Sequence, residues 1–213
     1  ISEIYALSDY ILEEWKIEKI GEPGGIFCND EPLYNQAVDF FYNSRDNGSL
    51  PNYIAETGQL QESGRDQAHC MLGVGVLAEL AECAWKQGDN LYAALDNRIM
   101  KGYEYLSKVN LGYTDVPFEV WKDATGKYCN WQNMGEAELG KFRAVFEIAY
   151  NHYVERRGIA MPYTEKVLKR IRPEGIGWTC DNPGFGTLLF YLGKNEPVPL
   201  EGQISEQLKY GWE

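Results

Sequence analysis

An apolar segment from Cys70 to Trp85 constrains the fold of this chain more than any other stretch, because it is long enough for a buried helix. Directly before it, residues 62–69 hold two acids, an arginine, a glutamine and a histidine. Polar side chains at the N-terminus of a core helix commonly form a binding or catalytic site that the rigid helix holds in place. The same residues also fit a simpler interpretation, in which Ser63 or Asp66 caps the helix and Arg65 forms a surface ion pair.

Helical periodicity runs through most of the chain and predicts an all-α fold in a single domain, residues 1–213. Short connections favour antiparallel helix hairpins, and the longer irregular stretches 53–64 and 111–135 would gather at one end. Gly73 and Gly75 lower helix propensity, and we explain them by close packing against a neighbouring backbone. The predicted helices are residues 2–19, about 30–42, about 66–87, about 90–108, about 136–157, and a short one from Thr164 to Pro173.

The helix predicted for residues 136–157 carries an apolar stripe and ends before Gly158, a favourable residue just past a helix C-terminus. Arg143 and Tyr150 are seven residues apart, so on such a helix they share one face at about 10 Å along the axis. His152 would lie on the opposite side. For Tyr150, ordinary amphipathic packing remains the alternative interpretation.

The net charge of −12 argues against general nucleic-acid binding. The charge is uneven, however: residues 1–62 hold 3 basic and 12 acidic residues, whereas residues 141–172 hold 8 basic and 3 acidic ones. A locally basic region can attract an anionic ligand, although a solvated helix face equally explains the charges after residue 155. No apolar run reaches the roughly 20 residues of a membrane span, so we expect a soluble chain.

The motifs of several enzyme classes are missing from the sequence. The five cysteines are scattered without a CxxC pair, so we expect reduced thiols and no zinc site. Neither a phosphate-cradling glycine loop nor a Ser-His-Asp order supports a kinase or a hydrolase. We expect no metal and no cofactor, and no leader-like pattern follows Ile1.

If His69, Arg143 and Tyr150 converge, they suit the abstraction of a proton α to a carboxylate. A neutral histidine accepts a proton near pH 7, and an arginine clamps the charge that develops on the carboxylate. A tyrosine gives a proton to a leaving oxygen, or acts as the base where a neighbouring cation lowers its pKa. Tyr128 and Trp131 would offer flat faces to sugar rings.

Several sequence blocks together resemble the alginate lyase domain family of bacterial polysaccharide lyases. The blocks are Gln61–His69, Leu91–Tyr92, Asp96–Arg98, Gly102–Tyr105, Phe142–Arg143 and Tyr150–Tyr153, within a similarity that covers roughly residues 26–192. The resemblance implies an α/α toroid, here a partial one because the chain has about half of the helices of a complete toroid. It also implies a periplasmic or secreted protein.

The activity implied by the resemblance is β-elimination on a uronic-acid polysaccharide such as alginate or a glucuronan. His69 would be the base or neutralise the carboxylate, Tyr150 would give the proton to the glycosidic oxygen, and Arg143 would pair with the carboxylate or the tyrosinate. We expect the loop 53–68, the start of helix 66–87 and helix 136–157 to line one cleft, with His69 and Tyr150 within about 10 Å. The candidate substrate-binding residues are Gln67, Arg65, Glu62, Tyr128, Trp131 and His152.

Two other classes remain open from the sequence. One is a non-catalytic glycan-binding domain derived from the same fold, and the other is a helical interaction domain whose hairpins form a scaffold surface. Formation of an unsaturated product from a uronan distinguishes a lyase from both.

Overall fold

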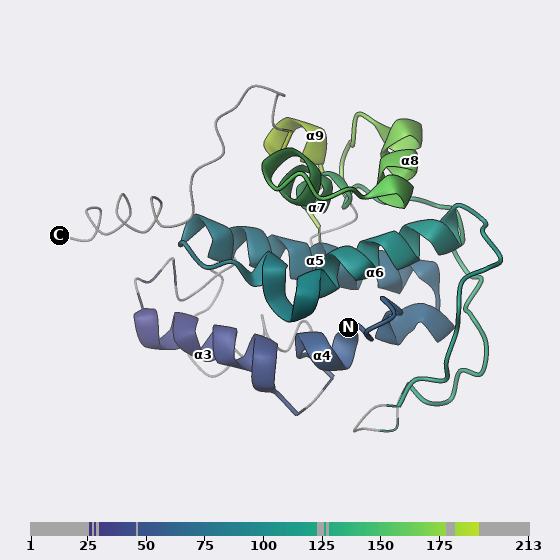
Figure 1. Ribbon diagram of the computed structural model, residues 1–213, viewed down its shortest axis with the longest axis horizontal. Helices are drawn as coiled ribbons and strands as arrows, with labels where there is room; N and C mark the ends of the chain where they lie inside the picture. Colours follow the sequence, from purple (N-terminus) through teal and green to yellow (C-terminus); the bar gives the residue numbers. More distant parts are fainter. Residues whose placement is uncertain are drawn as a thin grey trace.

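A computed structural model describes residues 26, 28, 30–45, 47–122, 126, 128–177 and 182–191 of the chain. Within these residues the protein is all-α, as predicted (Figure 1). They contain no β-strand, and the only β-pairing among them is two isolated bridges, Ile54 with Leu60 and Ile176 with Gly184. The helix predicted for residues 2–19 lies outside the described residues.

The helices differ greatly in length. The α-helices are α3 (Glu31–Asn43), α4 (Leu50–Tyr53), α5 (Gln67–Lys86), α6 (Ala94–Asn110), α7 (Glu147–Tyr150), α8 (Pro162–Ile171) and α9 (Gly186–Leu189). Two short 3₁₀ helices, Gln61–Gly64 and Leu91–Ala93, precede α5 and α6, and a π-helix, Asn151–Arg156, continues α7.

Helix α5 is the centre of the core, as its apolar sequence predicts. The Asp66 carboxylate accepts the His69 N–H at 2.8 Å, which confirms the predicted cap at the start of the helix. By length and composition α5 is the one described helix that could cross a membrane. Most of it is buried inside the protein, which is also what the core helix of a soluble domain shows.

Helix α6 lies beside α5 and runs in the opposite direction. Near its start, Tyr92 donates its hydroxyl to the Ala78 carbonyl in the second half of α5. At its end, the Asn110 side chain donates to Gln67 in the first turn of α5 at 2.9 Å. The α5–α6 pair therefore brings the end of α6 to the start of α5.

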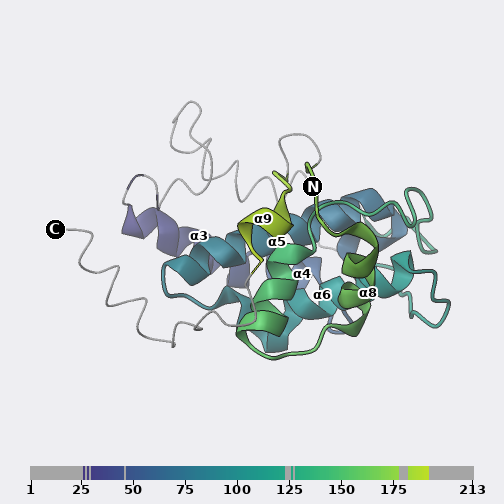
Figure 2. The same cartoon turned by 90° about the horizontal axis from the view of Figure 1, so that it is seen from above.

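The other helices cover two opposite sides of this pair. Figure 1 shows α3 and α4 on one side and α7, α8 and α9 on the other. Seen from above, α8 and α9 lie over the α5–α6 pair (Figure 2). The described part of the protein is therefore built in three tiers, with the most apolar helix in the middle one.

The long helix predicted for residues 136–157 is wrong over its first half, because residues 136–146 are irregular and α7 begins only at Glu147. Glu138 and Gly140 have φ of +62° and +74°, in the left-handed region. The Gly140 amide is satisfied by the Asn110 side chain at 3.0 Å instead of by a helical carbonyl. The predicted role of Gly158 just past the helix is confirmed by its φ of +67°.

The two glycines of α5 are explained by close packing, but against side chains instead of backbone. A Cβ atom on Gly73 would lie 1.7 Å from the Tyr53 hydroxyl oxygen. A Cβ atom on Gly75 would lie 3.0 Å from a methyl group of Val145. The side chains of Tyr53 and Val145 therefore pack so closely on α5 that a residue larger than glycine would not fit at these two positions.

Candidate functional site

The start of α5 holds a histidine whose orientation is fixed by a carboxylate. The Nδ1 atom of His69 lies 2.5 Å from Oδ2 of Asp66, while the other Asp66 oxygen accepts the His69 backbone N–H. An ionised carboxylate only accepts hydrogen bonds, so in neutral His69 the proton sits on Nδ1 and Nε2 keeps its lone pair. The His69 side chain is 25% exposed. This arrangement leaves Nε2 of a partly exposed His69 side chain as a proton acceptor.

Arg65 places a cation beside this pair. Its guanidinium nitrogens lie 3.6 Å from Asp66 Oδ2 and 3.6 Å from Glu62 Oε2. The Glu62 side chain is fully buried, whereas the Arg65 side chain is 36% exposed. The buried Glu62 carboxylate therefore anchors Arg65, and the partly exposed Arg65 side chain lies next to His69, where it can pair with an anion.

The aromatic residues of the irregular stretch 111–135 pack against the same place. A Cβ atom on Gly64 would lie 2.5 Å from Cβ of Trp131, so Trp131 lies directly against the residue before Arg65. Trp131 is half-buried, and its ring centroid is 5.6 Å from that of Tyr128. Tyr128 is only 1% exposed. Trp131 is therefore the ring that a ligand can reach, and Tyr128 supports it.

Gln67 lies beneath this surface. Its side chain is 1% exposed, donates to the Gly135 carbonyl at 2.8 Å and accepts from Asn110. Its backbone N–H donates to the Ala137 carbonyl. These contacts occupy both ends of the amide, so Gln67 holds the loop and α6 to α5 and does not serve as the substrate contact expected from the sequence.

Arg143 borders a different place, a hollow of about 430 Å³ beside the start of α7. Lys141 and Glu174 also line it. The Arg143 backbone N–H donates to the sulfur of Met71. Because Met71 is two residues and about 200° around α5 from His69, Arg143 and His69 lie on different faces of that helix.

Tyr150 also lies away from His69. Along α5, Val145 packs on Gly75 and His152 packs on Trp85, so Tyr150 lies beside the second half of the helix. At 1.5 Å per residue this is more than about 10 Å from His69 along the axis. The ring of Tyr150 is 5.0 Å from the Arg172 guanidinium. The predicted convergence of His69, Arg143 and Tyr150 is therefore wrong, because the helix on which it depended does not form.

The environment of Tyr150 does not make it a base either. Burial raises the pKa of its hydroxyl, and Glu165 raises it further, while Arg172 only partly opposes these effects. A neighbouring cation is present, as the base role requires, but burial has the larger effect.

His152 is a core residue. It is 1% exposed, stacks on the Tyr92 ring at 3.8 Å between centroids and meets the Trp85 ring edge-on at 4.8 Å. Burial, together with the nearby charges of Arg156 and Arg157, lowers the pKa of its imidazole to about 3. The neutral ring serves packing, and its burial prevents the substrate contact that we expected from the sequence.

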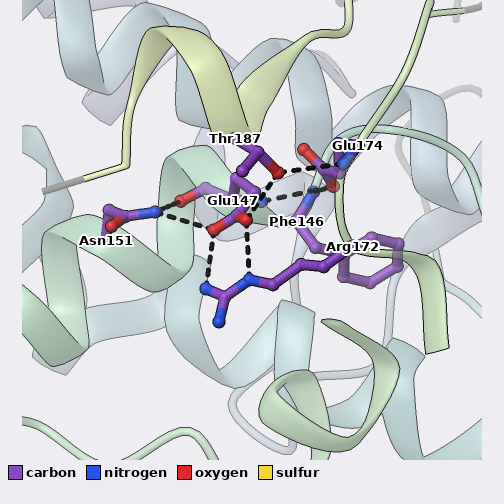
Figure 3. Close-up of polar contacts among 6 residues, drawn as sticks. All are labelled: Phe146, Glu147, Asn151, Arg172, Glu174 and Thr187. Carbon is purple, nitrogen blue, oxygen red and sulfur yellow. Dashed lines mark hydrogen bonds and ion pairs between the residues drawn. The ribbon is translucent and has the colours of Figure 1, made fainter. Parts of the chain in front are cut away.

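A buried ion pair between Glu147 and Arg172 joins the helices on this side of the molecule (Figure 3). Arg172 makes two hydrogen bonds to Glu147, at 2.7 and 2.8 Å, and Glu147 is fully buried. Asn151 and Thr187 each donate to Glu147 at 2.8 Å. The carboxylate of Glu147 therefore ties together α7, the end of α8 and α9.

Glu174 is the second carboxyl group of this network, and sequence analysis missed it. One of its oxygens accepts the backbone N–H groups of Phe146 and Glu147, at 2.7 and 3.3 Å (Figure 3). Its other oxygen, Oε2, is buried and has no hydrogen-bond partner among the described residues. Burial raises the pKa of Glu174 to about 7, even though the two amides favour its charged form. No sequence signal distinguishes it, since its burial depends on Gly186 lying against Oε2.

The structure therefore assembles part of the predicted site. His69, Arg65, Glu62 and Trp131 meet at the start of α5, with Tyr128 as support, and Asp66 joins them as the residue that orients the imidazole. The contact between Asp66 and His69 could have been predicted from their three-residue spacing, because this spacing brings a helix cap and a first-turn side chain together. In the part of the chain that the structure describes, no group of three or more histidine, cysteine, aspartate or glutamate side chains is placed to hold a metal ion.

Comparison with known proteins finds no match: no protein-family model fits the chain, and no curated protein or solved structure is significantly similar to it.

Proposed function

We propose that this protein is a polysaccharide lyase that cleaves a uronic-acid polymer by β-elimination at the start of α5. The observation that carries the proposal is the pairing of Asp66 with a partly exposed His69 beside the guanidinium of Arg65. These groups supply a proton acceptor and a carboxylate partner within one helical turn. Trp131 adds an aromatic face for a sugar ring at the same place.

In the proposed reaction, Arg65 pairs with the uronate carboxylate and stabilises the negative charge that develops on it. Nε2 of neutral His69 takes the proton from the carbon α to this carboxylate. The electron pair of that C–H bond forms the new double bond as the C–O bond to the neighbouring sugar breaks. The imidazolium of His69, stabilised by Asp66, returns its proton to the leaving oxygen. The products are an unsaturated uronate end and a free hydroxyl, so no water is consumed.

We propose that the antiparallel pair α5–α6 and the helices α7 and α8 form part of an α/α toroid. The protein then acts in the periplasm or outside the cell, where polysaccharides are found. An anionic polysaccharide is the expected partner, and no nucleic acid or cofactor is required.

Ultraviolet absorbance of the unsaturated product during incubation with alginate or polyglucuronate tests the proposal. The wild-type protein should produce it, and His69→Gln should lower the rate at least ~100-fold. Asp66→Asn is the sharper variant, because asparagine keeps the helix cap but no longer stabilises the imidazolium as a carboxylate does. It should lower the rate at unchanged thermal stability. A wild-type protein without eliminase activity on any uronan, or a fully active His69→Gln protein, contradicts the proposal.

A non-catalytic glycan-binding domain is the second candidate. It is favoured by the separation of Arg143 and Tyr150 from His69, which leaves the described site without a dedicated proton donor for the leaving oxygen. Under this alternative, the wild-type protein binds a uronan without producing the absorbance, and Arg65→Gln weakens the binding.

A further inference from the structure

Two tyrosines and two lysines form a surface cluster where the end of α6 meets the start of α8. The rings of Tyr113 and Tyr163 meet edge to face, with centroids 5.2 Å apart. The Lys166 ammonium lies 5.3 Å from the Tyr113 centroid and 5.2 Å from the Tyr163 centroid. The Lys108 ammonium lies 5.5 Å from the Tyr163 centroid. We call these four residues the tyrosine–lysine patch.

The patch is accessible, and Lys166 is its cation without a carboxylate partner among the described residues. Tyr113 is 40% exposed and Lys166 is exposed. Among the described residues no carboxylate lies within ion-pair distance of Lys166, which instead donates to the Tyr113 hydroxyl at 2.8 Å. Two acids beside the patch already have partners. Asp115 pairs with Lys108 at 2.8 Å, and Glu104 accepts the first backbone amides of α8.

The patch lies at the same end of the protein as the candidate site. Lys108 is two residues before Asn110, whose side chain bonds to Gln67, itself two residues before His69. Figure 1 shows α8 over the end of α6, on the side of the molecule where α5 begins. A chain-like ligand at His69 therefore extends toward the patch if it follows this end of the α5–α6 pair.

We propose that the tyrosine–lysine patch is a second binding site for an anionic sugar polymer, separate from the groups around His69. The tyrosine rings provide an apolar face for the C–H side of a sugar ring. Lys166 provides a cation for a carboxylate of the same or the next sugar. The identity of the polymer as a uronan rests on the proposed function, whereas the recognition of an anionic sugar rests on the patch itself. The patch would hold the polymer without taking part in the chemistry.

Binding measured by electrophoresis in gels that contain a uronan tests this inference, because retardation does not depend on cleavage. Lys166→Gln and Tyr113→Ala should each weaken retardation about 5-fold, the scale of losing roughly 1 kcal/mol. Lys169→Gln is the matched control. Lys169 is also exposed on α8 and carries the same charge, but it is paired with Glu165 at 2.6 Å. It should change retardation less than twofold. Tyr113→Phe keeps the ring and should bind nearly as the wild type does, with thermal melting as the check on folding.

The outcomes separate this inference from the proposed function. Retardation of the wild type without any unsaturated product overturns the lyase proposal and leaves the patch standing. If Lys169→Gln weakens binding as much as Lys166→Gln, only general charge attraction is present and the inference is overturned. Equal retardation by polyglutamate, with Tyr113→Ala unchanged, also overturns it, because a sugar ring is then not recognised. A wild-type protein that no uronan retards overturns it as well.

Discussion

His69 and His152 carry the same side chain in opposite environments, and the environment determines what each can do. His69 is partly exposed and oriented by Asp66, so it can exchange a proton with a ligand. His152 is stacked in the core with its pKa lowered to about 3, so it is neutral near pH 7. The sequence marks both as rare residues but does not show which one is buried, because that depends on rings supplied by distant Tyr92 and Trp85.

A substitution at Tyr150 distinguishes the mechanism proposed from the structure from the one suggested by the sequence resemblance. Tyr150→Phe keeps the ring that lies against Arg172 and removes only the hydroxyl group. Because Tyr150 is remote from His69, we expect eliminase activity within about twofold of the wild type and little change in thermal stability. Steady-state rates of unsaturated-product formation on a uronan measure this. If instead the activity of Tyr150→Phe is abolished while binding is kept, the tyrosine is the proton donor and the site must differ from the one described.

Glu174 predicts how stability depends on pH. Its pKa rises from an ordinary 4.5 to about 7 on folding, so the folded state holds this proton more tightly than the unfolded state. The resulting stabilisation is fully present below about pH 4.5 and is lost as pH rises through about 7. Over this window the group alone should lower the unfolding free energy by roughly 3 kcal/mol. Urea denaturation from pH 5 to 8 measures it, and Glu174→Gln, which cannot titrate, should flatten this part of the profile. An equally steep decline in the variant assigns the effect to other groups.

At the scale of elements, the sequence predicted best the helices that are determined by their own residues. The core helix α5 has its apolar run and its Asp66 cap within 21 residues, and both are found in the structure. The irregular segment 136–146 could not be predicted in this way. Its apolar Leu139 suggested a helical stripe, but Leu139 is 43% exposed and Gly140 bonds to Asn110, 30 residues earlier. Tertiary hydrogen bonds prevailed there over local propensity.

Gly73 in α5 gives a prediction about packing between elements. Gly73→Ala would place a methyl group 1.7 Å from the Tyr53 hydroxyl oxygen and 2.3 Å from its ring carbon Cζ. Although alanine favours a helix, this overlap should destabilise the protein by about 1–3 kcal/mol in urea denaturation. Tyr53→Phe should cost little by itself, because the buried Tyr53 hydroxyl has no hydrogen-bond partner among the described residues. The double variant should recover part of the loss but not all of it, since the ring carbon remains. Additive effects of the two substitutions would contradict this explanation of the glycine.

For the whole molecule, the candidate site shows what a sequence can and cannot place. Glu62, Arg65, Asp66 and His69 are neighbours in the chain, and the helix start brings them together without help from the rest of the fold. Arg143 is 74 residues from His69, and its position depends on how the segment before α7 crosses α5. Local clusters are therefore predictable from sequence alone, whereas convergence across tiers requires the packing between them.

The Glu147–Arg172 pair holds α7, α8 and α9 together. Removing Arg172 should destabilise the protein more than removing the Glu147 charge. Among the described residues, Arg172→Leu leaves the fully buried Glu147 charge with the Asn151 and Thr187 side-chain donors alone, so we expect a loss of about 3 kcal/mol. Glu147→Gln should cost less, because the Arg172 side chain is 32% exposed and its charge can be hydrated.

The double variant Glu147→Gln/Arg172→Leu should be more stable than Arg172→Leu alone, because no buried charge remains without its partner. The control is Lys141→Ala, which removes a cation paired with Glu138 at the surface and should change stability by less than about 1 kcal/mol. Urea denaturation of the four variants measures all of these changes. If Arg172→Leu and Glu147→Gln both change the unfolding free energy only slightly, the pair contributes no more than a surface ion pair. The hydrophobic contacts of the core alone then hold α7, α8 and α9 in place.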